Sequence, residues 1–176
     1  MGINPKDLQD ISELPSSELW DIVQAADNPE SIRNVAKSQL ATLRSFFEEG
    51  RLGMLIDGTG GNFDKMVREK NIAEALGYDT YMLFVDTSLP VAIERDAKRD
   101  RTLGPQKVEE IWQSVQDNKA RYREIFKEHF SIVENSVYGP PPKEVAKEIN
   151  VFVDSPVQNP IGQEWIEAEL DKRRRN

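Results

Sequence analysis

The sequence contains no cysteine and only one histidine, His129. Without cysteine the chain has neither disulfides nor thiolate ligands for a metal. A single histidine argues against a histidine-based metal centre and against a Ser-His triad. No apolar run approaches the roughly 18 residues of a transmembrane helix, and no secretion signal is recognisable. These absences together predict a cytoplasmic chain without a membrane span.

The net charge and the length further restrict the class of protein. The formal net charge of −8 over 176 residues argues against a general nucleic-acid binder, so no DNA partner is expected. Hydrophobic residues make up 38% and charged residues 31%, which suits a polar globule of one domain. We find no internal repeat.

The phosphate-binding motif G-x-x-x-x-G-K-[ST] is also absent. The nearest candidate runs from Gly58 to Lys65. Phe63 stands where the motif requires its second glycine, and Lys65 comes one residue too late. These residues therefore do not form a loop of this type.

The most informative stretch that is present runs from Gly53 to Lys65. The apolar residues 54–56 end at Asp57, and three glycines follow within four residues. This pattern predicts a strand over 53–57, a tight loop, and a helix over 64–76. A carboxylate at the end of a parallel strand is well placed to face a magnesium ion or a reacting hydroxyl, and amides at the start of the next helix can hold an anion.

The rest of the chain alternates between strand and helix patterns. Strands are predicted over 53–57, 80–85 and 130–134, and an extended piece over 151–153. Helices are predicted from 28 to about 49, over 91–100 and 143–149, from 105 to about 128, and from 160 onward. This alternation is typical of an α/β fold with a mostly parallel sheet.

The apolar and charged residues of the predicted helices allow further expectations. We expect the apolar face of helix 28–49 to contact the core and Trp112 to line the core or a groove. We expect a solvated face for Lys119, Arg121 and Arg123.

The segment Asp57-Gly58-Thr59-Gly60, followed by Asn62-Phe63-Asp64-Lys65, resembles the region after the third strand of zeta-toxin-like P-loop kinases. Kinases of this kind also occur in tailed phages. The resemblance continues through Gly77–Arg101 to about Ser136, some three quarters of the chain. It implies a three-layer α/β sandwich of the P-loop NTPase type, with the central first strand missing from this chain.

The resemblance also implies roles for individual residues. Asp57 would bind magnesium through water. The acceptor site would be lined by Gly58, Thr59, Gly60 and Asn62. The phosphates would be steadied by Arg95, Arg99 and Arg101, although a salt-bridged helix face is the alternative for these arginines. Asp7 is the positional match for the catalytic base, with helix capping as its alternative.

The function that the resemblance implies is nucleotide-dependent phosphotransfer, with ATP or GTP and Mg²⁺ as cofactors in the complete family protein. Because the phosphate-binding loop is absent, we expect the chain by itself to be inactive. The acceptor, a small molecule or a nucleotide-like compound, stays open. One alternative is a non-catalytic remnant that binds a ligand or a protein, and another is an incomplete reading frame.

Two expectations concern organisation. Residues 1–136 are expected to form the kinase-like core, and residues 137–176 a proline-rich linker and a helical extension packed on it. A missing central strand would leave backbone groups of its neighbours unpaired, which costs about 1–3 kcal/mol for each buried group. We therefore expect strands 53–57 and 80–85 to pair directly, residues 150–153 to substitute, or a homodimer to supply the missing element; the remaining alternative is a poorly ordered protein.

Overall fold

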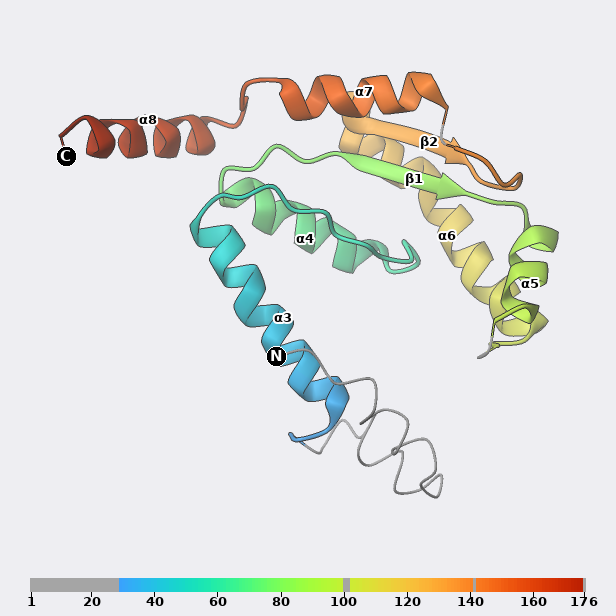
Figure 1. The fold of residues 1–176 in the computed structure, drawn as a ribbon. Coiled ribbons are helices and arrows are strands. Elements are labelled where there is room, and N and C mark those ends of the chain that lie inside the picture. The colour runs from blue at the N-terminus through green and yellow to red at the C-terminus, as the bar shows by residue number, and fades with distance from the viewer. Residues whose placement is uncertain (1–28, 100–101, 141, 176) are drawn as a thin grey trace. The chain divides into compact units, whose positions relative to one another are not determined.

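The computed structural model describes residues 29–99, 102–140 and 142–175 (Figure 1). The fold is α/β, with helices and a small parallel sheet of two strands. The chain divides into two compact units, residues 1–54 and 55–176, and each is described by itself. None of the described helices is long and apolar enough to cross a membrane.

The first unit contains helix α3 (Ile32–Glu49). The side chain of Ser31 caps it by accepting a hydrogen bond from the Asn34 amide, so the helix begins three residues later than the Asn-Pro pattern predicts. No residue of α3 is buried, and Leu40 is 65% exposed. The apolar spacing therefore correctly identified a helix, and the prediction that its apolar face contacts a core stays a prediction.

The second unit carries all the other described elements. In chain order they are α4 (Phe63–Ala75), β1 (Met82–Asp86), α5 (Leu89–Ala97), α6 (Pro105–Phe126), the short 3-10 helix η1 (Lys127–His129), β2 (Phe130–Glu134), α7 (Lys143–Asp154) and α8 (Pro160–Arg175). The two strands predicted over 80–85 and 130–134 are confirmed, the first with a shift of one to two residues.

Strands β1 and β2 are parallel, and their register pairs Met82 with Phe130 and Asp86 with Glu134. Successive side chains of a strand point to opposite faces of the sheet. Phe84 packs in the core on one face together with Tyr122 of α6. On the opposite face, Ser131 donates a hydrogen bond to Glu148 of α7. Helices α6 and α7 thus contact opposite faces of this small sheet.

The core lies between the sheet, α4 and α6. Its buried centre is Phe84, Tyr122 and Phe126, and partly buried apolar side chains surround these three residues. Phe63 and Met66 of α4 belong to this shell, so the helix that follows the glycine-rich loop is packed on the same core as α6. The core therefore fixes the start of α4, where the loop ends.

The predicted strand over 53–57 is not formed, and this prediction is wrong. Residues 52–59 have no regular secondary structure, and the side chain of Leu55 is 93% exposed. An apolar run becomes a buried strand only where another strand accepts its backbone hydrogen bonds. The described sheet contains β1 and β2 alone, so the expected direct pairing of 53–57 with the next strand does not occur.

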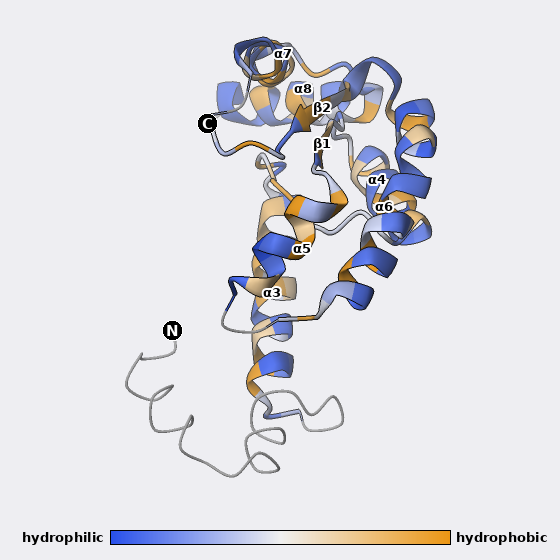
Figure 2. Ribbon diagram, turned by 90° about the vertical axis from the view of Figure 1, so that its right-hand side faces the viewer, coloured by the Kyte–Doolittle hydropathy of each residue, from blue (hydrophilic) through white to orange (hydrophobic). Residues whose placement is uncertain are grey.

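Residues 151–153 also differ from the prediction, because they form the last turns of α7 rather than an extended strand. Figure 2 shows hydrophilic residues along one side of α7 and hydrophobic residues along the other. Phe152 lies on the packed side and contacts the ring of Tyr81 at a centroid distance of 5.0 Å. Tertiary packing of an amphipathic helix outweighs the strand preference of Val151 and Val153, and the expected substitute strand is absent.

Helix α8 is attached at its first turn to the end of α4. The side-chain amide of Asn159 donates hydrogen bonds to the carbonyl oxygens of Glu74 and Tyr78, at 2.8 and 3.2 Å. Gly77 and Gly162 meet backbone to backbone, since a Cβ built on Gly162 would lie 2.2 Å from the Gly77 oxygen. Gly77 also has a φ of +95°, a conformation that glycine adopts without strain.

Candidate functional site

The glycine-rich loop is held in place by one face of α6. The buried Asn118 donates hydrogen bonds from its side-chain amide to the carbonyl oxygens of Gly60 and Gly61, at 3.3 and 3.0 Å. The Tyr122 hydroxyl donates to Gly60 at 2.7 Å, and the Ser114 hydroxyl donates to Gly61 at 2.9 Å. Residues 114, 118 and 122 are spaced by four, so they form one stripe of the helix. Gly60 takes a φ of +73°, which explains a glycine at this turn.

The polar side chains of the loop have different surroundings. Asn62 caps α4 by accepting a hydrogen bond from the Lys65 amide at 2.9 Å. Its role in the structure is therefore to start the helix, and its side-chain oxygen is already engaged. Asp57 and Thr59 are exposed and make no hydrogen bond or ion pair with the residues that the structure describes. Both remain accessible to a ligand.

A cation lies beside this loop. The Arg121 guanidinium stands 3.5 Å from the centroid of the Phe63 ring and donates a hydrogen bond to Asn118 at 3.0 Å. Asn118 is the residue whose amide binds the loop carbonyls, so one side chain connects the loop and the cation. The expectation that Arg121 lies on a merely solvated helix face is therefore incomplete, because its position is set by the ring and by Asn118.

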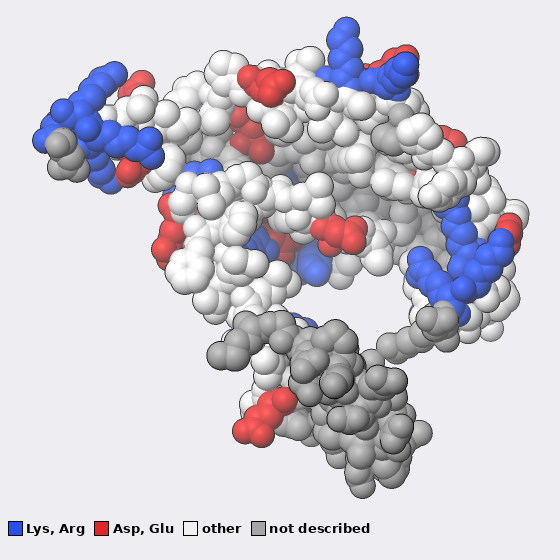
Figure 3. All heavy atoms as spheres, viewed as in Figure 1, with Lys and Arg blue, Asp and Glu red and all other residues white. Residues whose placement is uncertain are grey.

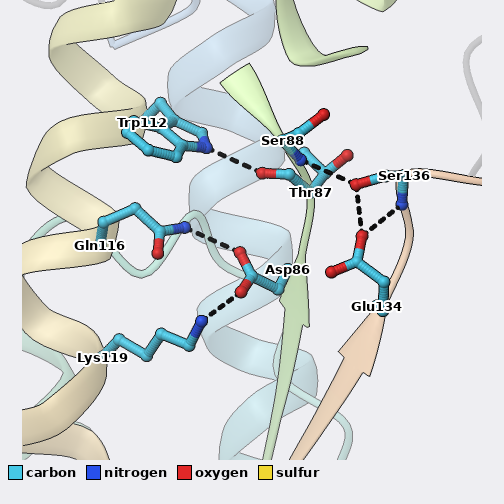
Figure 4. Close-up of polar contacts among 8 residues, drawn as sticks. All are labelled: Asp86, Thr87, Ser88, Trp112, Gln116, Lys119, Glu134 and Ser136. Carbon is cyan, nitrogen blue, oxygen red and sulfur yellow. Dashed lines mark hydrogen bonds and ion pairs between the residues drawn. The ribbon is translucent and has the colours of Figure 1, made fainter. Parts of the chain in front are cut away.

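A second polar cluster forms at the carboxyl ends of the strands, shown in Figure 4. Gln116 donates a hydrogen bond to Asp86 at 2.8 Å, and the Lys119 ammonium forms an ion pair with the other carboxylate oxygen. Burial, the largest influence, would raise the pKa of Asp86, but the hydrogen bonds from Lys119 and Gln116 outweigh it and hold the pKa below its ordinary value. Lys119 also lies 5.6 Å from the centroid of the Phe84 ring, so it is not simply solvated.

The neighbouring strand end carries further polar contacts. The indole nitrogen of Trp112 donates to the Thr87 carbonyl at 2.8 Å, and the Ser88 amide donates to the Ser136 hydroxyl at 2.9 Å (Figure 4). Ser136 in turn donates from its hydroxyl and amide to Glu134, and these bonds lower the pKa of that carboxyl. Residues 112, 116 and 119 form a second stripe of α6. This helix therefore holds both the glycine-rich loop and the strand end.

A buried carboxylate of α5 binds the residues just before α6. Asp96 accepts hydrogen bonds from the amides of Leu103 and Gly104, the shortest of them at 2.9 Å. These amides precede the first turn of α6, where an anion is favourable. The carboxylate of Asp96 is the anion at this position. Asp96, which lies between Arg95 and Arg99 in the sequence, therefore has a structural role.

The predicted arginines lie on and just after α5, where Figure 3 shows a group of basic side chains. Arg95 is half-buried and Arg99 is exposed. Within the described residues, no hydrogen bond, ion pair or ring contact joins either arginine to residues 57–62. Among the described residues, the structure therefore brings the end of the loop onto α6 and shows no direct contact between the loop and these two arginines. Asp7 and Arg101 lie outside the described residues.

The donor set does not complete the cofactor sites that the kinase resemblance implies. No group of three or more His, Asp or Glu side chains among the described residues could hold a metal ion, and Asp57 stands alone at the loop. The carbonyl oxygens of the glycine turn accept bonds from α6, and no loop with the spacing of a phosphate cradle is present. The described residues therefore contain neither a complete cluster of metal ligands nor a phosphate cradle, and the magnesium role of Asp57, which would act through water, stays a prediction.

The residues that hold both clusters were missed by the sequence reasoning. Ser114, Asn118 and Tyr122 contact loop residues 53–62 positions away in the sequence. A usable signal existed: Asn118 is a polar residue within the apolar face that Val108, Val115, Tyr122 and Phe126 form on α6, and a polar side chain on a buried face needs a hydrogen-bond partner. What the polar residues bind could not be read from the sequence, because the partners are backbone carbonyls of a distant turn.

No protein-family model, curated protein or solved structure matches the chain.

Proposed function

We propose that the protein is a nucleotide-dependent phosphotransferase of the zeta-toxin-like group, and that the described residues form the acceptor side of its site without completing the phosphate site. The P-loop kinase arrangement, a three-layer α/β sandwich, is part of this proposal. The observation that carries it is the double role of α6, which holds the turn after Asp57 with one stripe and the carboxyl end of β1 with another.

The geometry supports this proposal through the position of the polar groups. In parallel α/β sheets, ligands bind outside the carboxyl ends of the strands. Asp86 and Glu134 are paired in register at that edge, and Lys119 is present there as a cation. Phosphoryl transfer spreads negative charge over the moving group, and fixed cations lower its energy.

The loop supplies the groups that would meet an acceptor. Asp57 and Thr59 are exposed on a turn whose backbone is fixed by three side chains of α6. A carboxylate held on a fixed backbone can accept the proton of an acceptor hydroxyl, provided that the hydroxyl reaches it within hydrogen-bonding distance. Arg121 adds a positive charge beside the same turn.

A second candidate, a non-catalytic binding module, is favoured by the internal pairing of the charged groups. Asp86 is satisfied by Lys119 and Gln116, and Asp96 by two backbone amides. A site whose charges are already paired is organised for structure rather than for turnover. The two candidates differ in whether a phosphorylated ligand binds at the loop.

The first test is an NMR titration of the labelled protein with inorganic phosphate and then with MgADP. We expect weak binding with shifts at residues 57–62 and near Lys119, and smaller shifts near Arg95 and Arg99. The matched control is Lys172→Ala, which removes an exposed lysine of α8 that forms its ion pair with Glu169. Shifts confined to the basic residues 173–175 would overturn the proposal.

The second test measures turnover. We expect no ATP hydrolysis and no phosphotransfer by these 176 residues alone, because positioning of the phosphates supplies most of the rate in this chemistry. Turnover that disappears in Asp57→Ala would show a complete phosphate site and contradict the stated incompleteness. Turnover that persists in Asp57→Ala would contradict the placement of the site at the loop.

A further inference from the structure

A groove of about 610 Å³ lies at the amino ends of the strands, away from the clusters described above. Its walls come from the residues before β1, from η1 and from α7. Ligand sites of small molecules commonly have volumes of roughly 300–1,000 Å³. None of the residues assigned to the proposed phosphotransferase site lines this groove.

Three aromatic rings form one wall of the groove. Tyr81, His129 and Phe152 lie within 5.0–6.2 Å of one another by ring centroid, and all three are half-buried. They come from three separate segments, and His129 is the only histidine of the chain. A cation held within about 6 Å of an aromatic face gains roughly 0.5–2 kcal/mol, depending on how far it is desolvated.

The charge of the lining favours the same kind of ligand. Four carboxylates line the groove against one ammonium group, that of Lys147. The carboxylates belong to Asp79, Glu128, Glu144 and Glu148. With the histidine counted as neutral, the lining therefore carries a formal net charge of −3, which opposes anions and attracts cations.

A partly buried chain of hydrogen bonds holds two of the walls together. The hydroxyl of Ser131, which is only 7% exposed, bonds to the hydroxyl of Tyr81 and donates to the carboxylate of Glu148. Asp79, which also lines the groove, accepts a hydrogen bond from the backbone amide of Gln158 at 2.7 Å. The ring of Tyr81 and the carboxylate of Glu148 are thus fixed before any ligand binds, which reduces the ordering cost of binding.

We propose that this groove binds a small organic cation, a substituted ammonium or guanidinium compound whose apolar part lies against Tyr81, His129 and Phe152. The carboxylates supply the electrostatic attraction, and the aromatic wall selects a weakly hydrated cation over a metal ion. This site is independent of the phosphotransferase proposal, because it shares no residue with the glycine-rich loop or with the Asp86 cluster.

The test is an NMR titration with benzyltrimethylammonium, with benzyl alcohol as the neutral comparison. We expect saturable shifts of the amides at 79–81, 128–129 and 148–152 with the cation, and affinity for benzyl alcohol at least about fivefold weaker, which corresponds to about 1 kcal/mol. Phe152→Leu keeps the apolar volume and removes the π face, so the cation should bind about fivefold less tightly to this variant. Glu164→Gln, a change to a carboxylate of α8 outside the groove, should leave the affinity unchanged.

Three outcomes would overturn the proposal. The first is equal binding of benzyl alcohol and the cation, which would indicate a merely apolar groove. The second is unchanged affinity in Phe152→Leu together with unchanged affinity in Glu148→Gln. The third is a set of shifts located outside the groove. Circular dichroism of each variant shows whether it is folded, so a loss of binding is not confused with unfolding.

Discussion

At the scale of residues, the positions of the loop and of the strand end depend mainly on side chains that bond to backbone atoms or to one another. Asn118 and Tyr122 bind the glycine turn, Asp96 binds two amides, and Lys119 and Gln116 bind Asp86. Most of these polar groups are buried or partly buried. A partly buried group that loses its partner costs more than an exposed one, because water replaces the lost bond only incompletely. The ion pair between Asp86 and Lys119 is the clearest case, since the two side chains are 14% and 30% exposed.

We predict that Lys119→Met lowers the free energy of unfolding at pH 7 by about 1–2 kcal/mol, a value reduced for the partial exposure of the lysine. The folded-state pKa of Asp86 is depressed, so its contribution is present above the ordinary carboxyl pKa and is lost as the pH falls through the lower folded value. The difference between wild type and variant should therefore shrink below about pH 4. Urea unfolding at pH 7 and near pH 3 measures both values.

The matched control is Lys107→Met, which removes an exposed ion pair with Glu110 on the same helix. It should change the stability by less than about 0.5 kcal/mol. A difference between wild type and Lys119→Met that stays constant from pH 7 to pH 3 would contradict the linkage to Asp86.

At the scale of elements, α6 and α8 are held in place by different kinds of contact. Helix α6 uses side-chain hydrogen bonds on two stripes, whereas α8 is attached by a close approach of two glycines and by Asn159. Beyond this first turn, Ile166 and Leu170 of α8 are exposed, and the last turn of the helix is basic. The attachment therefore depends on a few residues at one end of the helix.

We predict that Gly162→Ala lowers the stability by about 1–3 kcal/mol, the usual cost of forcing extra atoms into a packed contact. The new Cβ would lie 2.2 Å from the Gly77 oxygen and 2.8 Å from a methyl of Val157. In the Gly162→Ala variant, the backbone amides of α8 should exchange their hydrogens faster than those of α6. Gly139→Ala is the control, because a Cβ there meets nothing within 4 Å; equal effects of the two substitutions would contradict the contact.

At the scale of the whole molecule, the two compact units and the segments between elements determine which peptide bonds are accessible. The boundary between the units falls at residues 54 and 55, where the chain has no regular secondary structure. A second irregular segment follows β2 and contains Tyr138. Proteases attack exposed, irregular backbone first, because cleavage requires the chain to fit an extended binding site.

Among the bonds of the described residues, we predict that limited chymotrypsin digestion cleaves first after Leu55 and Tyr138, whose side chains are 93% and 98% exposed. Mass spectrometry of the early fragments identifies the bonds. Leu55→Ser and Tyr138→Ser should each abolish one early cut and leave the other. Early cleavage at the buried Phe84 or Phe126 would contradict the described core.

The sequence by itself determined most of the local structure. The apolar spacing located α4, α6 and α8 to within a few residues, the apolar run located β1, and β2 was predicted over 130–134, the residues that it occupies. These elements form where local propensity and the pattern of burial agree. The glycine turn at position 60 was also recognisable from the sequence. The capping role of Asn62 was not predicted, and its assignment to an acceptor site stays a prediction.

Only the tertiary structure decided whether each sequence pattern formed the element that it predicts. The apolar run before Asp57 resembles a strand, yet no strand among the described residues pairs with it, and Leu55 and Ile56 stay exposed. Residues 151–153 instead join a helix that packs on Tyr81. The roles of Asn118 and Lys119 depend on partners 33–58 positions away. Hydrogen bonds between distant segments depend on the path of the chain between them, and no local pattern of residues encodes that path.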